Sequence, residues 1–110
     1  MRVHNLNTRM NNGYREDATL EKYEIEAFSD ADEVWYEYEY GSYEGYGYAL
    51  LRKGDYYDLY DMGHCSCYGP TDKYTGFKST KSLAELKESF GINQEYYNLV
   101  SHLIASAEGL

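Results

Sequence analysis

The clearest hydrophobic pattern lies in the middle of the chain, where apolar and polar side chains alternate. In "VWYEYEY" the side chains of Val34, Tyr36, Tyr38 and Tyr40 project to one face, and those of Trp35, Glu37 and Glu39 to the other. This predicts a half-buried strand. "GSYEG" (41–45) then reads as a five-residue connection, "YGYALLR" (46–52) as a second strand, and "YYDLYDM" (56–62) as a third after a tight Lys53-Gly54 turn. We expect an antiparallel meander.

Two flanking segments have weaker patterns. Residues 18–28 are ambiguous between helix and strand, since Thr19 could cap a short helix whereas Tyr23, Ile25 and Ala27 alternate with charged residues. We favour a strand from Tyr23 to Phe28, followed by a loop at 29–32. After the Gly69-Pro70 turn, residues 74–80 could form a short edge strand.

The C-terminal third changes to a helical period. Ser82 and Glu85 form a capping-box pattern, Leu83, Leu86 and Phe90 make an apolar stripe, and Gly91 suits a C-terminal cap. Asn93 can cap a second helix, with Ile92 as a hydrophobic staple on Tyr97; its apolar side carries Tyr96, Tyr97, Leu99, Val100, Leu103 and Ile104. The predicted fold is α+β: an antiparallel meander of three to five strands followed by two C-terminal helices packed on one face.

The length of 110 residues fits one domain. We expect a flexible N-terminal segment over 1–13 and a single α+β domain over 14–110. No apolar run is long enough to span a membrane, and the N-terminus lacks the apolar core of a secretory signal. Cytoplasmic localisation is therefore expected.

The charge of the chain is strongly negative and unevenly placed. The net charge is −9, and residues 16–61 contain fourteen acids against three bases. Such a field disfavours direct contact with nucleic acid or anionic membranes and favours a basic protein as partner. The alternative is that the charge serves solubility alone.

The strand at 34–40 also supplies candidate binding residues. Glu37 and Glu39 should stand about 6.6 to 7 Å apart on one face, a pitch at which carboxylates can imitate nucleic-acid phosphates. Aromatic residues often anchor interfaces, and Tyr43 and Tyr46 flank glycines where no core is expected. The predicted partner-binding residues are Trp35, Glu37, Glu39, Tyr43, Glu44 and Tyr46. The alternative is an ordinary solvated sheet face.

The segment "GHCSC" holds three residue types that bind metals: His64, Cys65 and Cys67. Structural zinc sites commonly use two separated pairs of ligands, and the second pair is missing here. Zinc binding through these residues is therefore an alternative reading, as is a small thiol-dependent enzyme. Otherwise the two cysteines are reduced thiols that fill a tight strand end, and no cofactor is required.

The segment 34–72, through Tyr36, Gly41, Gly45, Gly47 and the run 63–70, resembles a segment of small uncharacterised proteins of bacteriophages and mobile elements. The resemblance covers about a third of the chain and carries over no activity or functional residues. It implies a context, because small acidic phage proteins are often inhibitors of host defence nucleases, several of them DNA mimics.

Together these observations lead us to expect a non-enzymatic, acidic, tyrosine-rich binding protein. Its most concrete form is a phage-encoded inhibitor of a CRISPR or restriction nuclease, acting on a basic nucleic-acid-binding surface. An exposed edge strand would also provide a surface for a homodimer.

Overall fold

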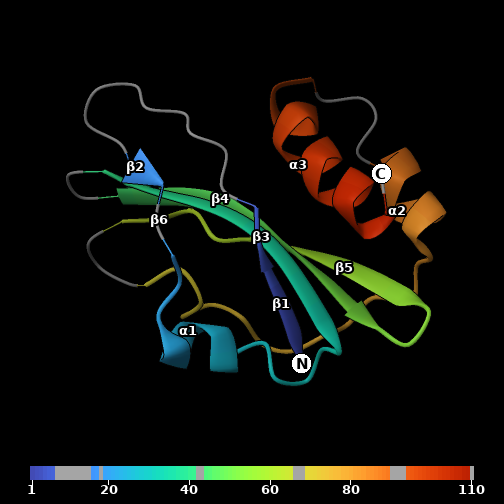
Figure 1. The fold of residues 1–110 in the computed structure, drawn as a ribbon, viewed down its shortest axis with the longest axis horizontal. Helices are drawn as coiled ribbons and strands as arrows, with labels where there is room; N and C mark the ends of the chain where they lie inside the picture. Colours follow the sequence, from blue (N-terminus) through green and yellow to red (C-terminus); the bar gives the residue numbers. More distant parts are fainter. Residues whose placement is uncertain (7–15, 18, 42–43, 66–68, 90–93, 110) are drawn as a thin grey trace.

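The computed structural model describes residues 1–6, 16–17, 19–41, 44–65, 69–89 and 94–109 (Figure 1). Its centre is an antiparallel meander of β3 (Glu33–Gly41), β4 (Glu44–Lys53) and β5 (Tyr56–Asp61). This part of the α+β prediction is confirmed. The alternation of apolar and polar side chains therefore predicts these three strands correctly.

The two hairpin connections differ in how well they were predicted. Gly41 pairs with Glu44, so only residues 42–43 connect β3 to β4, and the expected five-residue connection was too long. The β4–β5 turn is as predicted: Lys53 pairs with Tyr56, and Gly54 has φ of 61°. No described non-glycine residue has a positive φ, so the turn has the type II′ pattern, which places glycine first.

Three short strands complete a six-stranded sheet with the path β1-β3-β4-β5. β1 (Arg2–Asn5) pairs in parallel with the first half of β3, and β2 (Glu16–Asp17) pairs antiparallel with its second half. β6 (His64–Cys65) continues beside β4 beyond the end of β5. The sheet is thus mixed rather than purely antiparallel. Residues 2–5 belong to it, whereas we expected a flexible segment over 1–13.

The predicted strand from Tyr23 to Phe28 is wrong, because α1 (Lys22–Glu26) occupies this region. A capping box begins the helix: the Glu21 side chain accepts the Glu24 amide, and Glu24 Oε1 accepts the Glu21 amide at 2.7 Å. These bonds satisfy amides that would otherwise lack partners at the helix start. The local cap outweighs the alternating pattern.

The two C-terminal helices are confirmed as α2 (Leu83–Ser89) and α3 (Gln94–Ala107). The predicted capping box is present, since Ser82 Oγ accepts the Glu85 amide at 3.3 Å and Glu85 Oε1 accepts the Ser82 amide at 3.1 Å. The predicted caps Gly91 and Asn93 and the staple residue Ile92 lie outside the described residues.

The predicted edge strand at 74–80 is not formed. A single bridge between Tyr57 and Lys81 joins the end of this segment to β5. Asp30 holds the rest: its two carboxylate oxygens accept the Tyr74 hydroxyl at 2.8 Å and the Phe77 amide at 2.7 Å. Hydrogen bonds to the Asp30 side chain thus hold this segment in place of the main-chain pairing that a strand would need.

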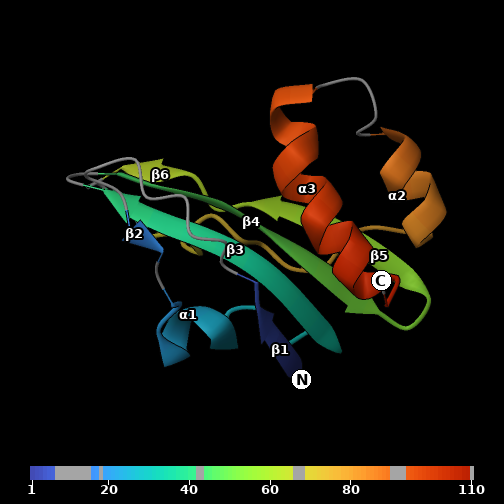
Figure 2. The ribbon, with the colours of Figure 1, turned by 45° about the horizontal axis from the view of Figure 1, so that its top comes forward.

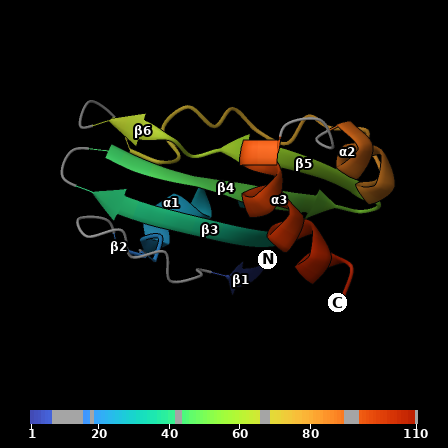
Figure 3. The same ribbon diagram turned by 90° about the horizontal axis from the view of Figure 1, so that it is seen from above.

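Both faces of the sheet are covered, as Figures 2 and 3 show. α2 and α3 pack on one face, as predicted, and α1 lies on the opposite face. The α3-side core contains Trp35, Tyr48, Leu50, Leu86, Val100, Leu103 and Ile104. The α1-side core contains Leu20, Phe28, Ala31, Val34, Tyr36, Tyr38, Ala49, Leu51 and Met62. Among the helices of the described ranges, none is long and apolar enough to cross a membrane.

Tyrosine serves as core material on both faces. Tyr36, Tyr38 and Tyr48 are buried. Burial raises the pKa of Tyr36, whose hydroxyl oxygen accepts the Leu20 amide at 3.1 Å. A ring with a polar tip can therefore be buried without losing its hydrogen bond.

Candidate functional site

The predicted binding face of β3 is largely covered by α3. Trp35 and Glu37 are each only 5% exposed, so β3 is buried on both faces rather than half-buried. Trp35 lies in the α3-side core, where it stacks on Tyr57 with ring centroids 6.2 Å apart. These two residues support the fold in this structure.

A histidine explains how a carboxylate is accommodated there. The Nδ1 atom of His102 on α3 pairs with Oε1 of Glu37. Burying a carboxylate without a partner would cost free energy of folding, and the bond to His102 offsets that cost. The alternating pattern placed Glu37 on the correct face, but that face is not solvated.

The other predicted binding residues lie toward the β3–β4 connection. Glu39 and Tyr46 are half-buried, and the Tyr46 ring meets Tyr48 edge-on with centroids 6.0 Å apart. Glu44 pairs through its backbone with Gly41 and Cys65, and its side chain lies outside the described residues. Tyr43 also lies outside them.

The metal reading of "GHCSC" depends on atoms that the structure does not describe. The backbones of His64 and Cys65 form β6 beside Gly45 and Glu44. Their side chains, and Cys67 altogether, lie outside the described part. Within that part, no three His, Cys, Asp or Glu side chains come together as metal ligands.

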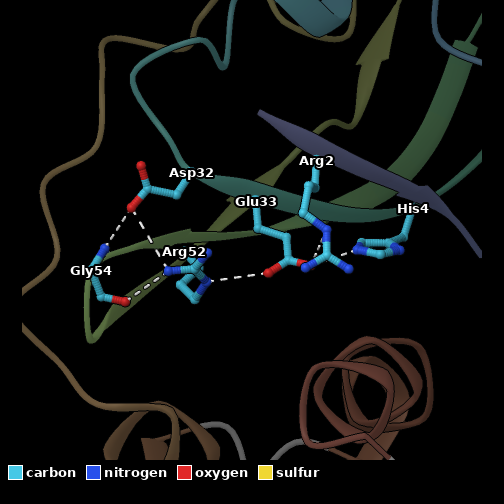
Figure 4. Close-up of polar contacts among 6 residues, drawn as sticks. All are labelled: Arg2, His4, Asp32, Glu33, Arg52 and Gly54. Atoms are coloured by element: carbon cyan, nitrogen blue, oxygen red, sulfur yellow. Dashed lines mark hydrogen bonds and ion pairs between the residues drawn. The ribbon is translucent and has the colours of Figure 1, made fainter.

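A network of charged side chains joins β1, β3 and β4 at the end of the sheet near the N-terminus (Figure 4). Glu33, only 8% exposed, receives His4 Nε2 at 2.6 Å and Arg52 Nε at 3.2 Å, and Arg2 Nε lies 3.7 Å away. The His4 ring stacks on Trp35 with centroids 5.3 Å apart. This network links the parallel β1 strand to the rest of the sheet.

The electrostatics of Glu33 follow from these contacts. Burial alone would raise its pKa, but the bonds from His4 and Arg52 and the charge of Arg2 outweigh burial and lower the pKa below its usual 4.5. Asp32, which precedes Glu33 in the chain, accepts the Gly54 amide at 2.8 Å and lies 3.7 Å from Arg52. The carboxylates of Asp32 and Glu33 are thus bonded to groups of the sheet itself, which favours a structural role for them.

An exposed aromatic ring within acidic surroundings lies on the opposite side, at α1. Tyr23 is 70% exposed, and its pKa is raised chiefly by the charge of Glu24, with burial, Glu21 and Asp72 adding to the effect. Glu21, Glu26 and Asp72 are exposed, and Glu26 lies one helical turn from Tyr23. We call Glu21, Tyr23, Glu26 and Asp72 the α1 surface.

The strand predicted over Tyr23–Phe28 does not indicate the α1 surface, because the surface depends on a helix. The signal that could have found it is the pair of glutamates three apart, Glu21 and Glu24, which is a helix-start pattern. A helix places Tyr23 and Glu26 on one side, whereas a strand would have placed them on opposite sides. The surface combines an aromatic anchor with negative charge.

Comparisons with protein-family models, with curated proteins and with solved structures found no match for this chain.

Proposed function

We propose that this protein is a non-enzymatic binding protein that docks its α1 surface on a basic surface of another protein. The observation that carries the proposal is Tyr23, which is 70% exposed and lies within the field of Glu21, Glu24 and Asp72. Lys22 on the same helix forms an ion pair with Glu26 at 4.0 Å. Aromatic residues supply the anchors of many interfaces, and complementary charge steers association and sets specificity. An arginine- or lysine-rich partner can meet both the ring face and the carboxylates.

We propose the contact on α1 rather than on the Glu37 face of β3. Glu37 is 5% exposed and paired with His102, so it cannot reach a partner without displacing α3. The net charge of −9 supports a basic partner in either case.

The most concrete form of the proposal is an inhibitor of a defence nuclease of the CRISPR or restriction type. Such enzymes hold nucleic acid in grooves lined by lysine and arginine, to which an acidic protein surface is complementary. The resemblance of residues 34–72 to phage proteins supports this context. Occupying that groove would displace the nucleic acid.

A displacement assay tests the proposal. Labelled duplex DNA is bound to a Cas9–guide RNA complex or to a restriction endonuclease without its catalytic metal, and the protein is titrated in. We expect DNA release that weakens as salt rises from about 0.05 to 0.3 M. No release from any enzyme of such a panel would contradict the nuclease form of the proposal.

Matched variants locate the contact. Tyr23→Ala with Glu26→Lys removes the exposed ring and reverses one charge of the α1 surface, and should weaken displacement at least about tenfold. Tyr56→Ala with Glu88→Lys makes the same chemical changes at other exposed positions and should leave displacement unchanged. Equal loss in both double variants would show that general charge, not the α1 surface, makes the contact.

A further inference from the structure

The outer edge of β5 has a main-chain group, the Leu59 carbonyl, that the described residues leave open. β5 ends the strand path, and on its outer side the Tyr57 amide donates to the Lys81 carbonyl at 2.9 Å. Outward and inward main-chain groups alternate along an antiparallel strand, so Leu59 and Asp61 also direct theirs outward. The Leu59 amide is met by Asp58 Oδ1 at 3.0 Å, but no described residue donates to the Leu59 carbonyl.

A cavity lies beside this open edge. Its volume is about 390 Å³, and it lies between β5, the segment that precedes α2, and α2 itself. The lining residues are Asp58, Leu59, Lys78, Ser79, Thr80, Lys81, Leu86 and Ser89. The cavity thus combines apolar side chains, hydroxyl groups, two ammonium groups and the carboxylate of Asp58.

The charge of this cavity is opposite to that of the whole chain. Lys78 and Lys81 are exposed, and neither forms an ion pair with a described carboxylate; Lys78 Nζ donates to Thr75 Oγ1 at 2.6 Å. The nearby acids are engaged with backbone amides, since Asp58 accepts those of Leu59 and Lys78, and Glu85 accepts that of Ser82. The pKa of Glu85 is lowered chiefly by hydrogen bonding with Ser82 and further by the charge of Lys81. Neither lysine lies within ion-pair distance of a described carboxylate, so both ammonium groups can meet an external anion.

We propose that this edge and cavity bind an extended acidic segment of a partner protein. The segment would add to β5 as a further strand, donating a main-chain amide to the Leu59 carbonyl, while its carboxylates meet Lys78 and Lys81. Strand addition supplies main-chain hydrogen bonds, and pockets beside the edge select alternate side chains. An apolar side chain between the acids would contact Leu59 and Leu86. The inference is independent of the α1 surface, because it involves other residues and the opposite charge.

A peptide titration tests the proposal on the full chain. The probe is a capped, labelled hexapeptide, Glu-Val-Glu-Val-Glu-Val, followed by fluorescence anisotropy and by backbone amide chemical shifts. We expect shifts at residues 58–61 and 78–81. The variant Lys78→Gln with Lys81→Gln should bind about tenfold more weakly, while Lys22→Gln with Lys53→Gln, which loses the same charge elsewhere, should bind within about twofold of the original.

Further probes separate strand addition from simpler binding. A hexapeptide N-methylated at alternate residues cannot donate to the edge and should bind at least about tenfold more weakly. Equal binding of the methylated peptide, equal shifts with inorganic phosphate, or no shifts at 78–81 would each overturn the proposal. So would a concentration-dependent dimer that the Lys78→Gln, Lys81→Gln variant dissociates, since a second copy would then occupy the edge.

Discussion

Glu37 on β3 pairs with His102 on α3, across 65 positions of the chain. The pair contributes the polar contact between a buried carboxylate and a helix that otherwise packs through apolar side chains such as Val100 and Leu103. Glu37 therefore helps to hold α3 on the sheet, and its substitution should affect the stability of the fold.

Replacing Glu37 with Gln should destabilise the fold rather than weaken a surface contact. The amide loses the charge-assisted bond to His102 while staying buried, a loss of about 1 to 3 kcal/mol in the free energy of unfolding. Urea unfolding at neutral pH measures it. Glu88→Gln, at an exposed position of α2, should change stability by less than about 0.5 kcal/mol. Wild-type stability in Glu37→Gln would show that the pair contributes nothing.

Glu33 predicts a pH dependence whose sign follows from its lowered pKa. A carboxylate with a folded pKa below its usual 4.5 stabilises the fold above that pH, and the stabilisation is lost as pH falls through the folded value. Glu33→Gln should therefore be less stable than the original protein by about 1 to 3 kcal/mol at pH 7. The difference should shrink progressively as pH falls below 4.5, again by urea unfolding. A difference that stays constant would contradict the assignment.

Gly47 is expected to tolerate no side chain. It lies on β4 opposite Tyr38, and a Cβ atom there would overlap the Glu37 carbonyl oxygen and come within 2.9 Å of the Tyr38 Cα. Gly47→Ala must force the two central strands apart, and should lower the melting temperature by several degrees or prevent folding. Gly63→Ala is the control, because its Cβ would meet only the Asp61 side chain, at 3.1 Å. Equal melting temperatures would refute this close approach.

Asp30 should control the segment that covers the α1-side core. Asp30→Ala removes the acceptors of the Tyr74 hydroxyl and the Phe77 amide. Hydrogen exchange at the Phe77 amide should speed up at least about tenfold, while exchange in the central strands changes little. Asp55→Ala, at another exposed acid in the β4–β5 turn, should leave Phe77 exchange unchanged. Unaltered exchange in Asp30→Ala would mean that packing alone holds the segment.

The elements that the sequence predicts correctly are those fixed by neighbours in the chain. Alternation and Gly54 predict β3, β4 and β5, and Ser82 with Glu85 predicts the start of α2. The error at α1 has a local cause too, since Tyr23, Ile25 and Ala27 alternate while the glutamates at 21 and 24 form a cap. Five helical residues are too few for a period to distinguish helix from strand.

What could not be predicted depends on distant partners. No residue close to Glu37 in the sequence indicates that a histidine of the C-terminal helix pairs with it. A carboxylate in an alternating strand is therefore predicted to face solvent. β1 lacks an apolar alternation, because Arg2 and His4 pair with Glu33 and the His4 ring stacks on Trp35. The α1 surface exists only on a helix, because in a strand Tyr23 and Glu26 would project to opposite faces.

The pairing of β1 has a consequence for how the chain folds during synthesis. β1 leaves the ribosome before its partner exists, because Arg2 pairs with Glu33 and Asn5 with Tyr36. The hairpins β3–β4 and β4–β5 close short loops and can form quickly, whereas the parallel pair must close a long one. We therefore expect β1 to join the sheet after the hairpins have formed.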